Sequence, residues 1–284
     1  MTAAVRVVAL DIDGTLLNSR KEISRRNHRA IAAARDRGMR IALVTGRRFP
    51  AAKKIADLVP GAGSLVLHNG GLVMEDGAPI RVRPLAHDTA VQVVSFAKGL
   101  GADPVVHAGH RGEGLLLVEN ASPSHTLLAY YLTKSHPDVR VVGNLEAAIA
   151  EAPDAPLQVM FGGSMAEMES LALALETARF PAAPLRTVYP RDDLSLIDVV
   201  APAVDKSEAL AFLCARWGVE MNEVLAIGDN WNDRLMLLGA GRGCVMGNAD
   251  RGLLELGLEI VPTNDEDGVA HAIERFALGN ASGQ

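Results

Sequence analysis

Short apolar runs alternate with helical patterns along the first 84 residues of the chain. Each run is only three to five residues long, which is typical of a strand buried on both faces of a sheet. The expected strands are residues 6–10, 41–44 and 65–67. Ser24 favours a helix that ends near Gly38. A second helix is expected around 51–58, and Asp76-Gly77 predicts a hairpin turn.

The middle of the chain has a different pattern from its two flanks. Pro and Gly are frequent there, and helical segments alternate with short apolar runs. The expected helices of this middle part are 88–98, 124–134 and 164–179. The strand–helix alternation then returns in the last third. Its expected strands are 194–200, 224–227 and 243–246. One expected helix of this part begins at Asp205 and ends at Gly218. Two more are expected over 233–238 and 269–278.

Alternation on both flanks indicates one parallel sheet, because parallel strands need crossover helices between them. We therefore expect an α/β protein with a doubly wound, Rossmann-like parallel-sheet core formed by residues 1–83 and 192–284. Residues 84–191 are expected to form an inserted α+β domain.

Composition narrows the class of protein. Of the 284 residues, 49% are hydrophobic and 22% charged, so the chain is expected to be globular rather than disordered. Cys214 and Cys244 lie in apolar surroundings at no metal-ligand spacing and are expected to be reduced. Asp11 and Asp13 interrupt the only early apolar run, so no signal peptide is expected. The longest uncharged stretch, 58–74, is too polar for a membrane span, and we predict a cytoplasmic protein.

The formal net charge of −6 is unevenly distributed along the chain. Residues 1–83 carry 15 basic and 7 acidic side chains, whereas residues 192–284 carry 6 and 16. Because both segments belong to the expected core, we interpret the basic segment as half of a charge-complementary domain. The arginine-rich stretch 20–40 also lacks the interleaved aromatic residues that stack on bases. No nucleic-acid partner is expected, and the oligomeric state is left open.

Polar residues follow two of the expected strands in the first third. Asp11 and Asp13 come directly after the first strand, and Gly14 allows a sharp turn. Thr45 and Gly46 follow the second strand, where a hydroxyl and backbone N–H groups can hold a phosphate oxygen. Ligand sites in open parallel sheets lie beyond the carboxyl ends of the strands. Taken singly, each of these motifs is more often an ordinary strand-end turn.

Two further sites lie in the last third. Lys206 stands at the expected N-terminus of a helix, where a cation opposes the helix macrodipole unless an anion lies nearby. Asp229 follows another strand, and Asn232 and Asp233 begin the next helix. That spacing suits a hard cation and its supporting groups. A solvated lysine and simple helix capping are the alternative interpretations.

The four sites are more informative in combination. They supply a carboxylate nucleophile, a second carboxylate, a hydroxyl group, a lysine and a metal ligand, all at the ends of elements in one alternating chain. Phosphoryl transfer needs this set, because it depends on positioning, on neutralising the phosphate oxygens and on a divalent ion. The sequence therefore indicates phosphoryl transfer.

These residues resemble the four motifs of the haloacid dehalogenase (HAD) superfamily of phosphatases. The matching residues are 11–15 (DIDGT), 45–47 (TGR), Lys206 and 228–233 (GDNWND). Three further stretches are similar to the Cof-like branch, which carries a large α/β cap of the C2B type. They are 67–71 (LHNGG), 246–249 (MGNA) and 264–270 (NDEDGVA). The resemblance covers nearly the whole chain in order, and the insertion 84–191 falls where that branch has its substrate-selecting cap.

The resemblance implies a Mg²⁺-dependent phosphomonoesterase. By it, Asp11 attacks phosphorus and forms an aspartyl-phosphate, while Asp13 protonates the leaving group and then activates water. Mg²⁺ is held by the Asp11 carboxylate, the Asp13 backbone carbonyl and Asp229. The other implied roles are phosphate binding by Thr45, Gly46, Lys206 and Asn232, and support by Gly14, Arg47 and Asp233.

The implied substrates are small phosphorylated metabolites, with sugar phosphates as the expected class. A phosphomutase of the same superfamily and a phosphate-accepting signalling module are the alternative functions. The chain departs from the family at Ala203 and Ser207, near positions where the third motif usually has glycine. This departure leaves the pose of Lys206 open.

Overall fold

The computed structural model describes residues 3–120 and 126–279. The chain divides into two compact units. The first, which we call the core unit, consists of Met1–Ile80 and Asp205–Gln284, and the second, the inserted unit, is Arg81–Val204. The first boundary lies close to the expected one, and the second follows residue 204 instead of residue 191.

The core unit contains a mostly parallel sheet. Its strands are β1 (Val7–Leu10), β2 (Arg40–Val44), β3 (Ser64–Leu67), β4 (Leu72–Glu75), β5 (Ala78–Val82), β12 (Val224–Gly228), β13 (Arg242–Met246) and β14 (Glu259–Val261). Within the described residues this sheet has eight strands in the order β14-β13-β12-β1-β2-β3-β4-β5. Neighbours are parallel from β14 to β3, and β4 runs antiparallel to β3. The central β1 and the outward winding in both directions confirm the expected doubly wound core.

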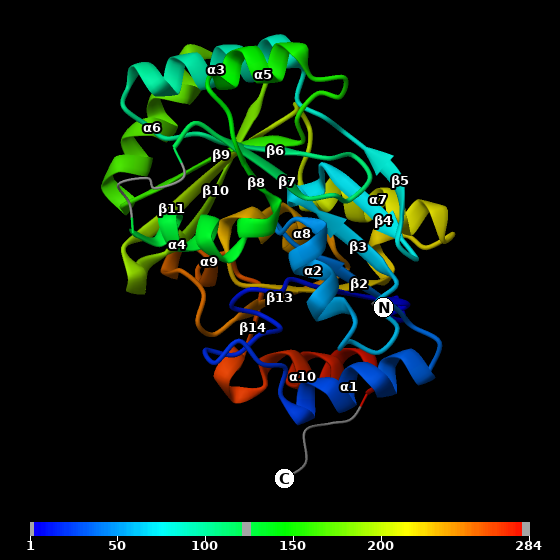
Figure 1. Ribbon diagram of the computed structural model, residues 1–284. Coiled ribbons are helices and arrows are strands. Elements are labelled where there is room, and N and C mark those ends of the chain that lie inside the picture. The colour runs from blue at the N-terminus through cyan, green and yellow to red at the C-terminus, as the bar shows by residue number, and fades with distance from the viewer. Residues whose placement is uncertain (1–2, 121–125, 280–284) are drawn as a thin grey trace. The chain divides into compact units, whose positions relative to one another are not determined.

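Helices cover both faces of this sheet. They are α1 (Arg25–Asp36), α2 (Phe49–Ala56), α7 (Lys206–Arg216), α8 (Arg234–Gly239), α9 (Arg251–Leu254) and α10 (Gly268–Ala272). Val7 and Ala9 of β1 belong to a buried cluster with Leu210 of α7 and Leu237 of α8. On the opposite face α1 and α10 lie side by side (Figure 1). Ser24 caps α1 as expected, since its hydroxyl accepts from the backbone N–H of the third helical residue at 3.0 Å.

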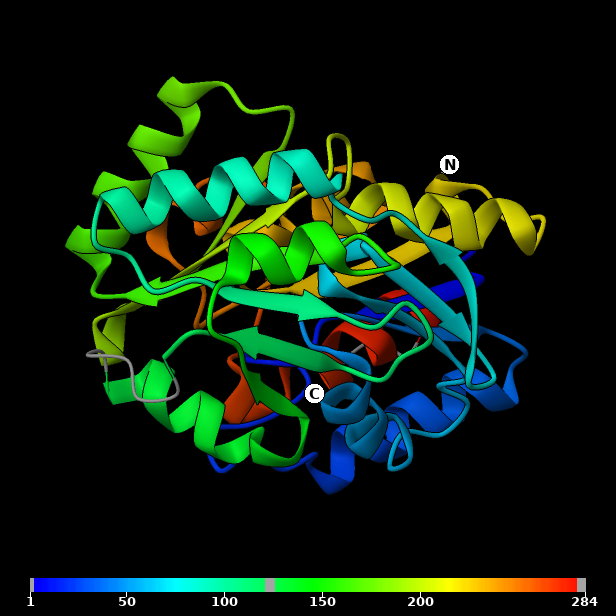
Figure 2. The ribbon, with the colours of Figure 1, turned by 45° about the horizontal axis from the view of Figure 1, so that its top comes forward.

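The inserted unit is an α+β arrangement around a second sheet. Its strands are β6 (Val105–Ala108), β7 (Leu115–Val118), β8 (Val139–Val141), β9 (Gln158–Gly163), β10 (Ala183–Tyr189) and β11 (Leu194–Val200), in the order β10-β11-β9-β6-β7-β8. Its helices are α3 (His87–Gly99), α4 (Thr126–Lys134), α5 (Leu145–Glu151) and α6 (Met165–Ala178). Helices α3, α5 and α6 pack on one face of this sheet, and α4 packs on the other (Figures 1 and 2). The first two residues of the expected helix 124–134 lie outside the described residues.

The strand at Leu194–Val200 forms as expected but not in the core sheet. It is β11, and it pairs antiparallel with β9 and β10 in the inserted unit. Only residues 190–193, which include the short turn Pro190–Asp192, separate β10 from β11, and this is too short for the crossover that a parallel partner requires. The two strands therefore form a hairpin, and the boundary between the units follows β11.

Three smaller expectations can be compared with the structure. Cys214 and Cys244 are free and buried, which confirms that they form no disulfide. The expected helix 269–278 is divided into α10 and a π-helical turn, Ile273–Ala277. Across residues 3–120 and 126–279, no helix combines the length and the apolar character that a membrane crossing requires.

Candidate active site

The carboxyl ends of three neighbouring core strands place the candidate site. Asp229, Asp11 and Thr45 directly follow β12, β1 and β2, which lie next to one another in the sheet. All three side chains are buried. Residues that are far apart in the sequence therefore meet where a ligand of a parallel sheet is expected to lie.

Lys206 lies between two carboxylates. Its Nζ atom donates to Asp11 Oδ1 and to Asp233 Oδ1, both at 2.6 Å. Only 1% of the lysine side chain is exposed. Burial opposes its charge, yet the attraction of the two carboxylates raises the pKa of Lys206 above its ordinary value. The N-terminus of α7 thus holds a buried cation whose conflict with the helix dipole is removed by nearby anions.

Ala203 lies in the loop before Lys206, near a position where the superfamily that the sequence resembles usually has glycine. This residue has a φ of +58°, a left-handed backbone conformation that favours glycine. Alanine therefore keeps the conformation for which glycine is the usual residue, and Lys206 still reaches both carboxylates.

Asp11, Asp229 and Asp233 form a compact carboxylate cluster. Each offers an oxygen, and these oxygens lie within 4.8 Å of one another. Burial raises the pKa of Asp11 to about 7 despite the attraction of Lys206. Burial, followed by repulsion from the other two carboxylates, raises the pKa of Asp229 well above its ordinary value. The single positive charge of Lys206 does not balance the charges of three ionised carboxylates. A cluster of this size that offers only oxygen atoms fits a hard divalent cation such as Mg²⁺.

Asp233 is held from two sides. Its Oδ1 atom faces Lys206, while its Oδ2 atom accepts from the backbone N–H groups of Asp229 at 3.1 Å and Asn230 at 3.0 Å. Gly228 lies close by, and a Cβ there would fall within 2.7 Å of the Asp233 side chain. Asp233 therefore braces the turn that carries Asp229.

Asp13 points to a different partner. Arg47 donates to its carboxylate through Nε at 2.6 Å and through Nη2 at 2.7 Å. Lys21 Nζ lies 3.6 Å from the same group. Burial opposes its ionisation, but the hydrogen bonds and charge of Arg47 lower the pKa of Asp13. The structure thus pairs Asp13 with Arg47 and leaves its carboxylate out of the cluster around Lys206.

Thr45, Gly46 and Asn232 come together around one further residue, Asn69. The Thr45 hydroxyl accepts from the backbone N–H of Arg47 at 3.2 Å. Asn232 Nδ2 donates to Asn69 Oδ1 at 3.0 Å, and a Cβ on Gly46 would lie 3.1 Å from the same oxygen. Three of the four expected phosphate-binding groups are therefore neighbours of a residue to which the sequence assigned no role.

Three other residues support the site without having been assigned a role from the sequence. Thr15 Oγ1 donates to Asp229 Oδ1 at 2.7 Å. Asn248 Nδ2 donates to the carbonyl of Gly14 at 2.8 Å, and Asn264 Nδ2 donates to that of Leu17 at 2.9 Å. Asn248 and Asn264 lie in stretches that resemble the Cof-like branch, which was the only signal for them. Their contacts pin the loop that follows Asp13.

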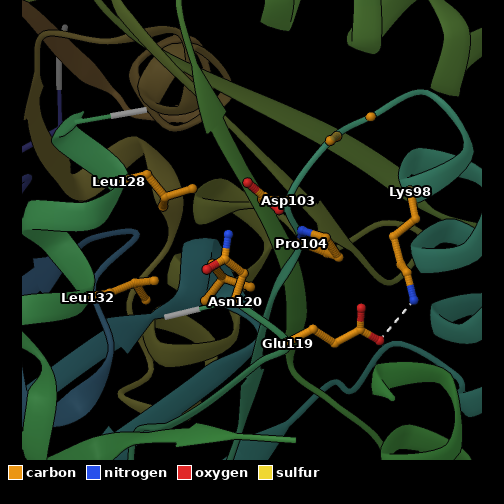
Figure 3. A pocket seen from close by; sticks show the side chains of 10 residues that line it. Lys98, Asp103, Pro104, Glu119, Asn120, Leu128 and Leu132 are labelled. Carbon is orange, nitrogen blue, oxygen red and sulfur yellow. Dashed lines mark hydrogen bonds and ion pairs between the residues drawn. The ribbon is translucent and has the colours of Figure 1, made fainter. Parts of the chain in front are cut away.

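A separate pocket of about 230 Å³ lies within the inserted unit (Figure 3). The Lys98 side chain points toward Glu119, and its Nζ donates to Glu119 at 2.8 Å and to Glu146 at 2.9 Å. Leu128 and Leu132 of α4 line another wall. The lysine of this pocket is thus paired with two carboxylates, and the pocket includes none of the predicted site residues.

Comparison with known proteins gives one family over most of the chain. A family model described as haloacid dehalogenase-like hydrolase matches residues 8–273. The chain is 27% identical over 278 residues to 5-amino-6-(5-phospho-D-ribitylamino)uracil phosphatase YcsE of Bacillus subtilis (strain 168), covering 96% of each chain. It is 28% identical over 274 residues to an HMP-PP phosphatase of Serratia proteamaculans (strain 568), covering 95% of each.

A solved structure gives the same result. The crystal structure of a haloacid dehalogenase-like hydrolase from Bacteroides thetaiotaomicron superposes with a TM-score of 0.77 at 25% identity, covering 95% of this chain and 99% of the other. Family, relatives and fold support a phosphatase role. The chain therefore belongs to the haloacid dehalogenase-like hydrolase family.

Proposed function

We propose that the chain is a Mg²⁺-dependent phosphomonoesterase that hydrolyses small phosphorylated metabolites, with sugar phosphates as the substrate class. One observation carries the proposal. Asp11 Oδ1 lies 2.6 Å from Lys206 Nζ inside a buried cluster of three carboxylates. Carboxylate and phosphate repel each other, so attack by Asp11 requires cationic groups around both. Lys206 is one such group, and a bound metal ion supplies the other.

The proposed metal ligands are the Asp11 carboxylate, the Asp229 carboxylate and the Asp13 backbone carbonyl. All three are oxygens, which Mg²⁺ prefers. When bound, the ion neutralises phosphate oxygens and orients the substrate for attack. Thr15 fixes Asp229 by a buried hydrogen bond, so the ligand is oriented by the protein itself.

The proposed reaction has two steps. In the first, an Asp11 oxygen forms a bond to phosphorus while the ester P–O bond breaks, and the leaving oxygen takes a proton from Asp13. In the second, water attacks phosphorus, Asp13 takes a proton from that water, and the bond between Asp11 and phosphorus breaks. Inorganic phosphate is released and Asp11 is regenerated.

The pairing of Asp13 with Arg47 bears on the protonation of Asp13. The ionised Asp13 that Arg47 holds is the form that accepts a proton in the second step. Donation in the first step requires a protonated Asp13, so at least one of the hydrogen bonds from Arg47 has to be released when substrate binds.

The phosphate group is proposed to be held by four groups near Asp11. They are the Thr45 hydroxyl, the Gly46 backbone N–H, Lys206 and the Asn232 side chain. Each lies at the end of a core strand or the start of a helix, where backbone N–H groups and side chains can face an anion. Together they would position the phosphorus atom for in-line attack.

The substrate class is proposed from the kind of molecule that the relatives' names describe. YcsE is named for a phosphorylated ribityl compound and the Serratia enzyme for HMP-PP, and both are small phosphorylated metabolites. We propose that the inserted unit selects among such substrates. The cytoplasmic location expected from the sequence stays a prediction.

Metal removal tests this proposal. Hydrolysis of a generic aryl phosphate is expected to stop in EDTA and to return when Mg²⁺ is added in excess, because without the ion the phosphate meets unbalanced carboxylates. Release of inorganic phosphate is measured throughout. Activity that persists in the chelator would refute the metal role.

The product distinguishes the alternatives. A phosphatase releases inorganic phosphate, whereas a phosphomutase accumulates an isomer of its substrate. A signalling module would hold its aspartyl-phosphate for minutes instead of turning over rapidly. Following phosphate, isomer and phosphoprotein in one reaction separates the three functions.

A further inference from the structure

The turn that follows β3 has an unusual backbone. His68 and Asn69 are consecutive non-glycine residues with φ values of +50° and +54°, and Gly70 follows at +110°. Left-handed backbone is costly for residues with a Cβ, and such strain persists only where the surrounding structure maintains it. Asn69 is fully buried, so this turn is not a surface loop.

The turn is tied to two loops of the candidate site. The backbone N–H of His68 donates to the carbonyl of Arg47 at 3.1 Å, and that of Asn69 donates to the carbonyl of Thr45 at 3.2 Å. On its other side, a Cβ on Gly70 would collide with the backbone carbonyl of Asp205. The turn therefore packs between the loop after β2 and the residue that precedes Lys206.

The Asn69 side chain adds a third connection. Its Oδ1 atom accepts from Asn232 Nδ2 at 3.0 Å, which joins segments 163 residues apart. The same oxygen would lie 3.1 Å from a Cβ on Gly46, so the absence of a side chain at Gly46 allows this close approach. One carboxamide thus contacts both the segment with Thr45 and Gly46 and the segment with Asn232.

We propose that Asn69 is a positioning residue that fixes the phosphate-binding groups Thr45, Gly46 and Asn232 relative to one another. This inference rests on the proposed function, in which those groups hold the substrate phosphate. Asn69 acts through the Asn232 amide, whose orientation its hydrogen bond sets, and through the backbone of Thr45. Small displacements of such groups lower the rate, because the phosphorus atom is no longer aligned with Asp11.

A double-mutant cycle tests the inference. Asn69→Gly keeps the left-handed backbone accessible and removes only the carboxamide. Asn69→Gly is expected to lower kcat/KM for an aryl phosphate about tenfold, as for loss of one buried hydrogen bond. Asn232→Ala is expected to lower it at least as much, because this variant also loses the proposed contact with phosphate. Both variants are also expected to weaken inhibition by inorganic phosphate. Because Asn69 acts through Asn232, the double variant should lose much less than the product of the two single losses.

Asp76→Gly is the matched control. Asp76 has a φ of +50° in the same unit but lies exposed in the hairpin turn. Its replacement changes a left-handed residue to glycine in the same way without touching the site, so kcat/KM should stay at the wild-type value. Thermal unfolding of each variant monitors the fold. If Asn69→Gly does not fold, Asn69→Ala takes its place in the cycle, since alanine also lacks the Oδ1 atom that accepts from Asn232.

Two results would overturn the inference. One is a folded Asn69→Gly protein with wild-type kcat/KM and wild-type inhibition by phosphate. The other is a fully multiplicative loss in the double variant, which would mean that Asn69 does not act through Asn232. Neither result affects the proposed function, which fails instead if wild-type protein with Mg²⁺ releases no phosphate.

Discussion

At the scale of single residues, Lys206 determines the charge balance of the site. A buried ammonium costs several kcal/mol unless it is paired, and two carboxylates lie 2.6 Å from this one. With Asp229 the cluster still has more negative than positive groups. The remaining repulsion is the physical reason for expecting a divalent ion there.

Gly14→Ala tests how closely the loop after β1 approaches Asp229. A Cβ on Gly14 would collide with the Asp229 carboxylate, and the φ of +79° is itself unfavourable for alanine. We expect aryl-phosphate hydrolysis to fall about 100-fold, as for displacement of a metal ligand.

Gly77→Ala is the control for backbone strain in this experiment. Its φ is +81°, but a Cβ there would meet nothing within 4 Å. It should cost about 1–2 kcal/mol of stability and leave kcat/KM unchanged. Equal losses of activity in the two variants would contradict the role of the close approach.

The residues at strand ends could be predicted because local pattern fixes their position. Asp11 and Asp229 follow apolar runs, and Lys206 begins a helix with a recognisable cap at Asp205. Thr15 and Asn69 could not be assigned in this way. Their partners lie 214 and 163 residues away, and only the fold brings them together.

At the scale of elements, the Glu75 side chain connects β4 to the end of α7. Glu75 of β4 accepts from Trp217 Nε1 at 2.9 Å and from Arg216 Nε at 3.1 Å, both at the end of α7. The Trp217 hydrogen bond and the Arg216 charge lower the pKa of Glu75 despite partial burial. The helix that begins with Lys206 is thereby anchored at its other end.

Glu75→Gln tests this anchor. Because the folded state lowers the pKa of Glu75, its contribution is present above the unfolded value near 4.5 and is lost as pH falls through the lowered value. We expect the variant to lose about 1 kcal/mol of unfolding free energy at pH 7 and the difference to shrink below pH ~4. Urea unfolding at several pH values measures it.

Glu22→Gln is the control for this experiment. The Glu22 side chain is 62% exposed and pairs at 3.1 Å with Arg20, whose side chain is also exposed. The Glu22→Gln variant should show no measurable change in the free energy of unfolding at any pH. A Glu75→Gln difference that is independent of pH would contradict the assignment.

Very short elements, and the sheet to which a strand belongs, were harder to predict than strands with a clear apolar pattern. The apolar runs predicted β1, β2 and β12, whereas β8, β14 and α5 are three to seven residues long and gave no distinct pattern. The strand β11 was predicted, but its assignment to the core sheet was wrong. Periodicity indicates a strand and does not name its partner.

At the scale of the whole molecule, ion pairs join the basic first third to the acidic last third. Arg6 pairs with Glu223 at 3.4 Å, and Arg26 pairs with Glu274 at 2.6 Å. The uneven charge along the chain is therefore partly compensated inside the core unit. Each exposed pair contributes little to stability, so apolar packing remains the main contribution.

The core unit and the inserted unit have separate hydrophobic clusters. The substitution Phe161→Ala tests whether the two units unfold independently. Phe161 is fully buried in the cluster of the inserted unit. Its truncation is expected to cost about 3–5 kcal/mol. Hydrogen exchange should accelerate in β6, β9 and β11 and stay unchanged in β1 and β2, because the units need not unfold together.

Leu173→Ala serves as the control for that measurement. Leu173 lies on α6 of the same unit and is 66% exposed, so its truncation should leave exchange in both units unchanged. Uniform acceleration across both units in Phe161→Ala would show one cooperative structure instead of two.

The central claim is that Asp11 is the nucleophile, and acid quenching tests it most directly. Wild-type protein with Mg²⁺ is mixed with an aryl phosphate, quenched in acid within the first turnover and digested for peptide mass spectrometry. We predict that the peptide containing Asp11 carries one phosphoryl group. The substitution Asp11→Asn should abolish both this adduct and hydrolysis. Rapid hydrolysis with no adduct on Asp11, or more than a few per cent of activity in Asp11→Asn, would contradict the account.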